Sequence, residues 1–153
     1  MNKKNQPVMV NVGAKPITHR IARAQAVVLL PQAVWRCIRG GELSTPKGPV
    51  FQTARLAGIM AAKQTSALIP LCHPLALEDC RIEIRTGKQR TLIIECAAET
   101  HHKTGVEMEA LTGAALAALT IYDMCKGLSH DITIQSVRLL EKTGGKHTYI
   151  RKS

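Results

Sequence analysis

The chain has 153 residues, of which 45% are hydrophobic and 3% aromatic, and its formal net charge is +10 at pH 7. This length predicts one domain, residues 1–153, with a core of aliphatic side chains and a flexible tail at residues 1–6. The charge favours an anionic partner such as nucleic acid, anionic lipid or a phosphorylated small molecule, but so few aromatic residues argue against a surface that stacks unpaired bases.

The five cysteines are odd in number and include no C-x-x-C pair, so they predict free thiols in a cytosolic protein rather than disulfides or a zinc site. The basic start is not followed by an apolar run of signal length, and nowhere do about 18 apolar residues follow one another. We therefore expect a soluble, cytoplasmic protein with no bound metal and no membrane contact.

Strands are predicted at residues 9–13 (MVNVG) and 25–30 (QAVVLL). A short helix is expected over residues 31–39, ended by Gly40 and Gly41, because glycine readily takes the left-handed conformation found at helix ends. Residues 42–49 (ELSTPKGP) predict a loop that presents Lys47, since proline and glycine flank it on both sides.

A helix is predicted from Thr53, as its N-cap, to a point before Pro70, and residues 71–77 are expected to be irregular or extended. Residues 81–85 and 91–96 predict a β-hairpin, connected through residues 86–90. The longest helix is expected at residues 106–126, followed by Gly127, a strand at residues 131–140 and a polar tail. These elements predict an α+β sandwich with helices on one face of a mostly antiparallel sheet.

Three blocks resemble the MoaC family, the cyclic pyranopterin monophosphate synthases of molybdenum cofactor biosynthesis. They are KGPVFQTARLAGIMAAKQTSALIPLCHPLAL at residues 47–77, TGVEMEALTGAALAALTIYDMCKG at residues 104–127 and VRLLEKTGGK at residues 137–146. A weaker match, MVNVGAK, covers residues 9–15, so the resemblance extends over nearly the whole chain.

The resemblance implies a ferredoxin-like fold, a hexamer built as three dimers, and no metal ion or organic cofactor. It implies a phosphorus–oxygen lyase that converts 3′,8-cyclo-7,8-dihydroguanosine 5′-triphosphate to cyclic pyranopterin monophosphate and releases diphosphate. The family usually carries an aspartate where this chain has Asn11, which leaves open a catalytically weakened member.

The same resemblance assigns catalytic roles to Lys47, His73, Asp123 and Lys126. A lysine whose pKa is lowered by desolvation can transfer protons near neutral pH, and we expect Lys126 to do so. Lys47 is expected to shield phosphate charge from its loop, and His73 to bind substrate and transfer protons. Spacing alone also fits a surface ion pair between Asp123 and Lys126, three positions apart on one helix.

The resemblance further implies that Leu71, Cys72, His73, Met108 and Glu109 contact the substrate. The predicted substrate-binding set is completed by Glu107 and, as basic residues that can contact an anion, by Arg20 and Lys63. Glu107 has an alternative role, because Thr104 and Glu107 form a T-x-x-E pattern typical of a helix capping box. Lys15, Arg23 and the Gly144-Gly145-Lys146 turn are further candidate anion contacts.

Helix geometry adds an independent expectation about assembly. Glu109 and Asp123 are 14 positions apart, so an unbroken helix separates their Cα atoms by about 21 Å while they project within about 40° of one face. One pterin-sized ligand cannot contact both, and a site shared across a dimer interface is expected. The alternative from another class is a basic nucleic-acid-binding α+β domain, which the scarcity of aromatic residues disfavours.

Overall fold

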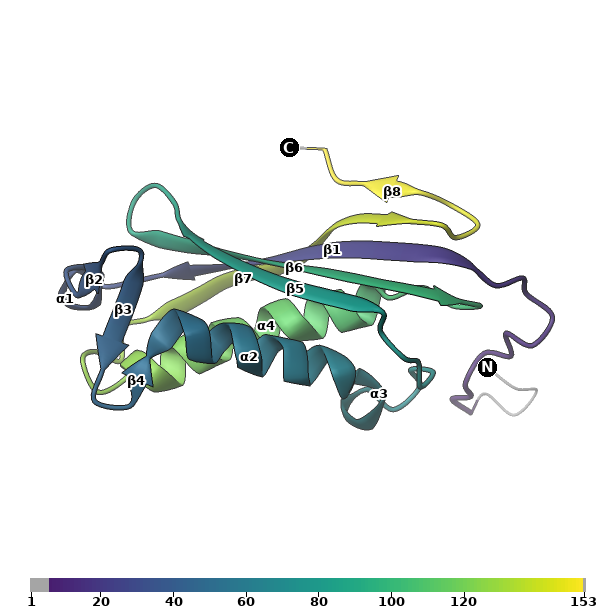
Figure 1. Cartoon of the computed structure of the whole chain (residues 1–153), viewed down its shortest axis with the longest axis horizontal. Coiled ribbons are helices and arrows are strands. Elements are labelled where there is room, and N and C mark those ends of the chain that lie inside the picture. Colours follow the sequence, from purple (N-terminus) through teal and green to yellow (C-terminus); the bar gives the residue numbers. More distant parts are fainter. Residues whose placement is uncertain (1–5, 153) are drawn as a thin grey trace.

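The computed structural model describes residues 6–152, which form a five-stranded antiparallel sheet with its helices on one face (Figure 1). The elements are β1 (Thr18–Leu29), α1 (Gln32–Trp35), β2 (Ile38–Arg39), β3 (Glu42–Thr45), β4 (Gly48–Pro49), α2 (Val50–Lys63), α3 (Thr65–Leu68), β5 (Asp79–Thr86), β6 (Thr91–His102), α4 (Glu107–Cys125), β7 (Thr133–Thr143) and β8 (Tyr149–Ile150). None of the helices within residues 6–152 is both long and apolar enough to span a membrane.

The large sheet has the strand order β5-β6-β1-β7-β8, and every neighbouring pair is antiparallel. Helix α2 follows β1 and leads to β5, whereas α4 connects β6 to β7. This alternation of strands and helices in a four-stranded core is the split β-α-β arrangement of ferredoxin-like folds. The predicted α+β class, with helices packed on one face, is therefore confirmed.

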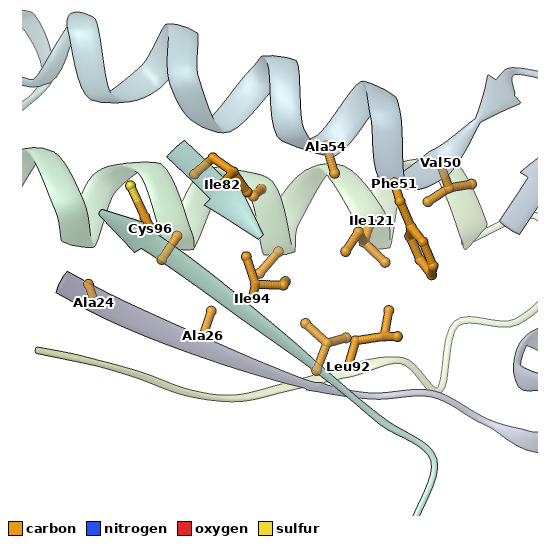
Figure 2. Packing of buried hydrophobic residues seen from close by; sticks show 14 of the residues in the cluster. Ala24, Ala26, Val50, Phe51, Ala54, Ile82, Leu92, Ile94, Cys96 and Ile121 are labelled. Atoms are coloured by element: carbon orange, nitrogen blue, oxygen red, sulfur yellow. The ribbon is translucent and has the colours of Figure 1, made fainter. Parts of the chain in front are cut away.

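Small side chains allow the two long helices to pack close to the sheet (Figure 2). Alternate residues of β1, among them Ala22, Ala24 and Ala26, are fully buried against the helices. Where α2 and α4 meet, a Cβ added at Gly58 would lie 2.8 Å from the carbonyl oxygen of Gly113. Glycine at position 58 therefore allows this close approach of α2 to α4.

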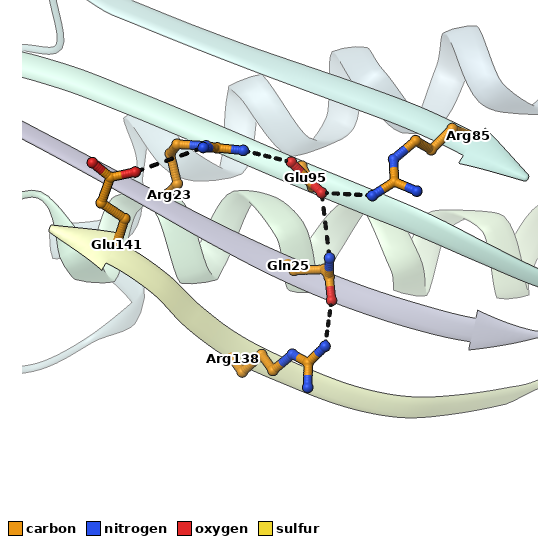
Figure 3. Close-up of polar contacts among 6 residues, drawn as sticks. All are labelled: Arg23, Gln25, Arg85, Glu95, Arg138 and Glu141. Carbon is orange, nitrogen blue, oxygen red and sulfur yellow. Dashed lines mark hydrogen bonds and ion pairs between the residues drawn. The ribbon is translucent and has the colours of Figure 1, made fainter. Parts of the chain in front are cut away.

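The opposite face of the sheet carries charged side chains that pair with one another (Figure 3). Glu95 accepts hydrogen bonds from Arg23, Gln25 and Arg85, and Arg23 also contacts Glu141 at 3.6 Å. Burial alone would raise the pKa of Glu95, but the hydrogen bonds from Arg85, Arg23 and Gln25, together with the charge of Arg23, outweigh burial and lower it. Arg23 is therefore held in this ion-pair network, on the face of the sheet opposite the helices.

Two predicted elements near the N-terminus are wrong. Residues 9–13 are not a strand, because this segment lies against side chains rather than along a strand edge. The helix expected over residues 31–39 is the single turn α1, after which the chain enters β2 and turns back at Gly40 and Gly41. Both glycines have positive φ, but they connect two strands rather than end a helix.

The predicted loop at residues 42–49 is instead a hairpin of β3 and β4, and Lys47 lies in its turn. Helix α2 begins four residues earlier than expected, because its N-cap position is Pro49 rather than Thr53 and its first residue is Val50. Thr53 lies within its first turn, where its hydroxyl donates to the carbonyl of Pro49. The helix also ends at Lys63, and α3 is a separate turn before Pro70.

The later elements follow the prediction closely. The hairpin of β5 and β6 and the long helix α4 are confirmed, with β6 extending to His102. The last long strand, β7, runs to Thr143 and so includes residues expected in the tail. Strand β8 was not predicted. The proposed flexible tail at residues 1–6 lies outside the described residues except for Gln6.

Candidate functional site

Most candidate site residues gather at the two ends of α4, a helix that runs along the long axis of the molecule (Figure 1). One cluster lies near the C-terminus of α4, beside the β3–β4 hairpin, and consists of Lys47, Asp123 and Lys126. The other lies near its N-terminus, beside the segment that follows α3, and includes His73 and Glu109. The helix between them is unbroken from Glu107 to Cys125.

Asp123 holds two lysines in the first cluster. Its Oδ2 atom is 2.8 Å from Nζ of Lys47, and its Oδ1 atom is 2.8 Å from Nζ of Lys126. Lys47 also donates to the backbone carbonyl of Asp123 at 3.0 Å. All three side chains are about half exposed, so a ligand can reach both ammonium groups.

Glu42 fixes the hairpin that carries Lys47. Its carboxylate accepts hydrogen bonds from the backbone N–H groups of Leu43 and Phe51 at 2.8 and 2.7 Å, and of Gln52 at 3.3 Å. It thereby satisfies free N–H donors at the start of α2 and places negative charge at the positive end of the helix. This carboxylate joins β3 to α2, and Lys47 extends from the adjoining turn.

The electrostatics of this cluster correct one expectation. Lys126 and then Lys47, as hydrogen-bond donors, lower the pKa of Asp123 to about 2. Asp123 in turn raises the pKa of Lys126, which is too exposed for desolvation to lower it. The expectation that Lys126 has a lowered pKa is therefore wrong. Lys126 is a persistent cation at neutral pH.

At the other end of α4, an open cavity of about 510 Å³ brings together two of the matched segments. Its lining includes Leu71, Cys72 and His73 from the segment after α3, and Glu107, Met108 and Glu109 from the first turn of α4. Val8, Val10 and Val12 form a further wall. Sequence reasoning placed the first six in one substrate-binding set, and the structure places them around one cavity.

His73 is tied to the segment that was expected to be a strand. Its Nε2 atom is 2.7 Å from the carbonyl oxygen of Val10. Nearby, Asn11 accepts a hydrogen bond from the backbone N–H of Gly13 at 2.8 Å, and Lys103 donates to the carbonyl of Gly13. The side chain of Asn11 thus stabilises a local turn in the wall of the cavity.

Glu109 is 4% exposed, although it lies at the edge of the cavity. Burial raises its pKa, and the nearby charge of Glu107 acts in the same direction. Within residues 6–152 it has no ion-pair partner. A carboxyl group of raised pKa exchanges protons closer to neutral pH than an exposed one, which suits general acid–base chemistry.

Glu107 does not form the predicted capping box. The N-cap residue of α4 is Val106, without a side-chain cap, and Thr104 lies outside the helix. Instead, Glu107 accepts a hydrogen bond at 2.8 Å from Lys142 of β7. The register of β1 and β7, which places Lys142 opposite Ala22, decides this contact.

A smaller cavity of about 250 Å³ adjoins the first and shares Lys15, Gly105 and Glu107 with it. Basic side chains dominate its lining: Lys15, Arg20, Lys103, Lys142, Lys146 and His147. Arg20 is 8% exposed, and its guanidinium donates to the carbonyls of His102 and Lys103. We call this the basic cavity.

Sequence reasoning missed Lys103, Lys142 and His147 as members of the basic cavity. Lys142 lies within the third matched block, residues 137–146, which was the signal that could have identified it. Lys63, by contrast, lines another cavity of about 430 Å³ with Cys80 and Glu78, which shares Leu75 with the first cavity. In the described part of the chain, no three His, Cys, Asp or Glu side chains converge as metal ligands.

Comparison with known proteins gives a consistent result. The MoaC family model matches residues 9–145. The cyclic pyranopterin monophosphate synthase of Xanthomonas oryzae pv. oryzae is 51% identical over 140 residues, covering 92% of this chain and 85% of that protein. The synthase of the same name from Thermomicrobium roseum is 48% identical over 147 residues, covering 95% and 87%. The molybdenum cofactor biosynthesis bifunctional protein of Synechocystis is 47% identical, and the match covers 95% of this chain but 43% of that protein.

Proposed function

This chain belongs to the MoaC family and is a cyclic pyranopterin monophosphate synthase, a lyase of molybdenum cofactor biosynthesis, and we propose that both ends of α4 supply its active site. The substrate is 3′,8-cyclo-7,8-dihydroguanosine 5′-triphosphate, and the products are cyclic pyranopterin monophosphate and diphosphate. The observation that carries the proposal is the placement of the matched residues in two clusters, one of paired cations and one around a cavity with a buried carboxyl group.

The cavity at the N-terminus of α4 receives the ring system. Glu109 can accept hydrogen bonds from the guanidine-like edge of the base, and its raised pKa suits proton transfer as the ring opens and recloses. His73 serves as a second proton-transfer group, and it must exchange its contact with Val10 for one with substrate. Leu71, Cys72 and Met108 provide the walls against which the ring lies.

Closure of the cyclic phosphate requires positive charge around phosphorus. A ribose-derived hydroxyl attacks the nearest phosphorus and passes its proton to a basic group, while the bond to the bridging oxygen breaks and diphosphate leaves. Lys47 and Lys126 offset the charge that develops on the phosphate oxygens. Asp123 keeps the two ammonium groups close together until the substrate phosphates bind them in its place. The basic cavity, with Arg20 and Lys142, suits the remaining phosphates.

The distance along α4 supports a site shared by two subunits. Glu109 and Asp123 lie about 21 Å apart along an unbroken helix. The outward side chains between them are apolar, since Leu119 of α4 is 52% exposed and Leu56 and Met60 of α2 are 61% and 52% exposed. An antiparallel pairing of these helical faces would bury that surface and join opposite ends of two α4 helices. We propose such a dimer, assembled three times into a hexamer of cytoplasmic enzyme.

Turnover of the cyclised substrate tests the function directly. We expect the purified chain, without added metal or cofactor, to release one diphosphate for each pterin product formed, as measured by a coupled diphosphate assay and by chromatography of the pterin. A nucleic-acid-binding domain would instead bind RNA or DNA and release no diphosphate, and that outcome would contradict the proposal.

Binding of the triphosphate should weaken as salt rises, because several cations of the basic cavity contribute to it. We expect Lys146→Ala to weaken substrate binding severalfold at low salt and to reduce the dependence on salt concentration. Lys88→Ala is the matched control, because Lys88 is an exposed lysine of the β5–β6 turn. Equilibrium binding of substrate and competition by inorganic diphosphate measure the effect. Affinity that does not change with salt would exclude this role for the basic cavity.

A further inference from the structure

Two thiols outside the proposed active site lie in contact across neighbouring strands. The Sγ atoms of Cys80 on β5 and Cys96 on β6 are 3.9 Å apart. In the strand register, Cys80 is opposite Ala98 and Cys96 is opposite Ile82, so the two cysteines are diagonal neighbours on the face that packs against the helices. We propose that Cys80 and Cys96 form a peroxide-reactive dithiol that closes reversibly to a disulfide.

The two thiols differ in access. Cys80 lines the cavity of about 430 Å³ that also contains Lys63, whereas Cys96 is fully buried. A small hydroperoxide therefore reaches Cys80 first. The hydrogen bond between the sulfurs lowers the pKa of Cys80 and raises that of Cys96, because it stabilises charge on the less buried sulfur. Cys80 is accordingly the attacking thiolate and Cys96 the resolving thiol.

The reaction balances in two steps with a hydroperoxide as oxidant. The Cys80 thiolate attacks one peroxide oxygen, the O–O bond breaks, and the leaving oxygen takes a proton as water or alcohol. Cys80 is then a sulfenic acid. Cys96 loses its proton and attacks the Cys80 sulfur, the S–S bond forms, and the S–O bond breaks to release water. The two thiols lose two electrons, which the peroxide gains, and a thiol reductant reverses the closure.

Packing directs Cys96 toward Cys80. A Cβ added at Gly113 would lie 2.6 Å from the Cys96 sulfur, so α4 covers this sulfur closely and prevents movement toward the helices. A disulfide requires the sulfurs to approach to about 2.05 Å, and side-chain rotation toward β5 provides that movement. Closure would link adjacent strands that are already paired along their whole contact, from Asp79–Glu99 to Thr86–Leu92.

The test uses the full chain carrying Cys37→Ser, because Cys37 is exposed and could link two molecules. The reduced, folded protein is treated with a small excess of hydrogen peroxide, and the remaining thiols are then alkylated in denaturant, because Cys96 is buried in the folded chain. We expect loss of two hydrogen atoms by intact mass and, after digestion with trypsin, a link between residues 64–81 and residues 91–103. Fragment spectra assign that link to Cys80 rather than Cys72, and dithiothreitol should restore both thiols.

Two single variants separate the steps. In Cys96→Ala, the sulfenic acid at Cys80 cannot be resolved and should be trapped by dimedone. In Cys80→Ala, the buried Cys96 should remain reduced. Thermal unfolding confirms that each variant is folded. If both thiols stay open to alkylation after peroxide treatment of the folded protein, or if the link joins a different pair, the proposal is wrong. The result does not depend on the proposed catalytic function.

Discussion

Replacing Lys47 or Lys126 by alanine is expected to lower turnover by about 10²- to 10³-fold, the loss typical when one preorganised group that stabilises transition-state charge is removed. The fold should survive, because both side chains are about half exposed and surface ion pairs contribute little to stability. Steady-state diphosphate release measures the loss, and thermal unfolding should give a melting temperature close to that of the parent chain.

A pH titration adds a readout that distinguishes the two lysines from purely structural residues. Together they lower the pKa of Asp123 to about 2 from an ordinary value of 3.8. The depressed pKa means that the paired carboxylate stabilises the fold above the ordinary value and loses that effect as the pH falls through about 2. Removing either lysine should move the Asp123 titration, followed by NMR, back toward 3.8. Lys88→Ala should change neither turnover nor this titration, and a Lys126→Ala variant with most of its activity would remove Lys126 from the mechanism.

The parts of the fold that could be predicted from sequence are those with long local patterns. Residues 106–126 repeat apolar side chains at helical spacing over five turns, and α4 follows them within about a residue. The strands β5 and β6 were also found, because each alternates or runs apolar beside a glycine-containing turn. In these elements the local pattern and the tertiary packing agree.

The errors occur where a tertiary partner decides the structure. The short strands of the β3–β4 hairpin form where Glu42 joins β3 to the start of α2, a contact that no local pattern indicates. Residues 9–13 have a strand-like composition, but their carbonyl groups bind His73 and Lys103 instead of a neighbouring strand. Contacts between residues that are 63 or 90 positions apart in the chain cannot be predicted from the spacing of residue types.

In the candidate site, too, local contacts could be predicted from sequence, whereas contacts between distant segments could not. The resemblance identified Lys47, Asp123 and Lys126, and spacing alone fitted the pair of Asp123 with Lys126. The ion pair that brings Lys47 to Asp123 spans 76 positions and required the fold. Spacing suggested a capping role for Glu107, whereas the strand register gave it Lys142 as a partner. The basic cavity draws on β1, the β6–α4 connection and the segment after β7, so net charge alone could indicate an anionic ligand but could not locate it.

Mixing two inactive variants should restore activity if the active site is shared between subunits. Glu109→Gln removes the carboxyl group at one end of α4, and Lys126→Ala removes the cation at the other, about 21 Å away. When subunits exchange freely in an equal mixture, half of the dimers contain one of each, and one of their two sites has both native groups. We therefore expect recovery of about one quarter of the parent activity.

A second mixture separates this arrangement from sites contained within one subunit. The double variant Glu109→Gln/Lys126→Ala is mixed equally with the parent chain. If sites are shared, every site in a mixed dimer has one defect, and only dimers of two parent chains are active. About one quarter of the parent activity then remains. If each site lies within one subunit, this second mixture would keep about one half of the parent activity, and the first mixture would recover none. Native mass spectrometry of isotope-labelled subunits establishes that exchange is complete. With exchange established, zero recovery in the first mixture and one half in the second would overturn the shared site, and α4 would then have to serve two separate functions at its ends.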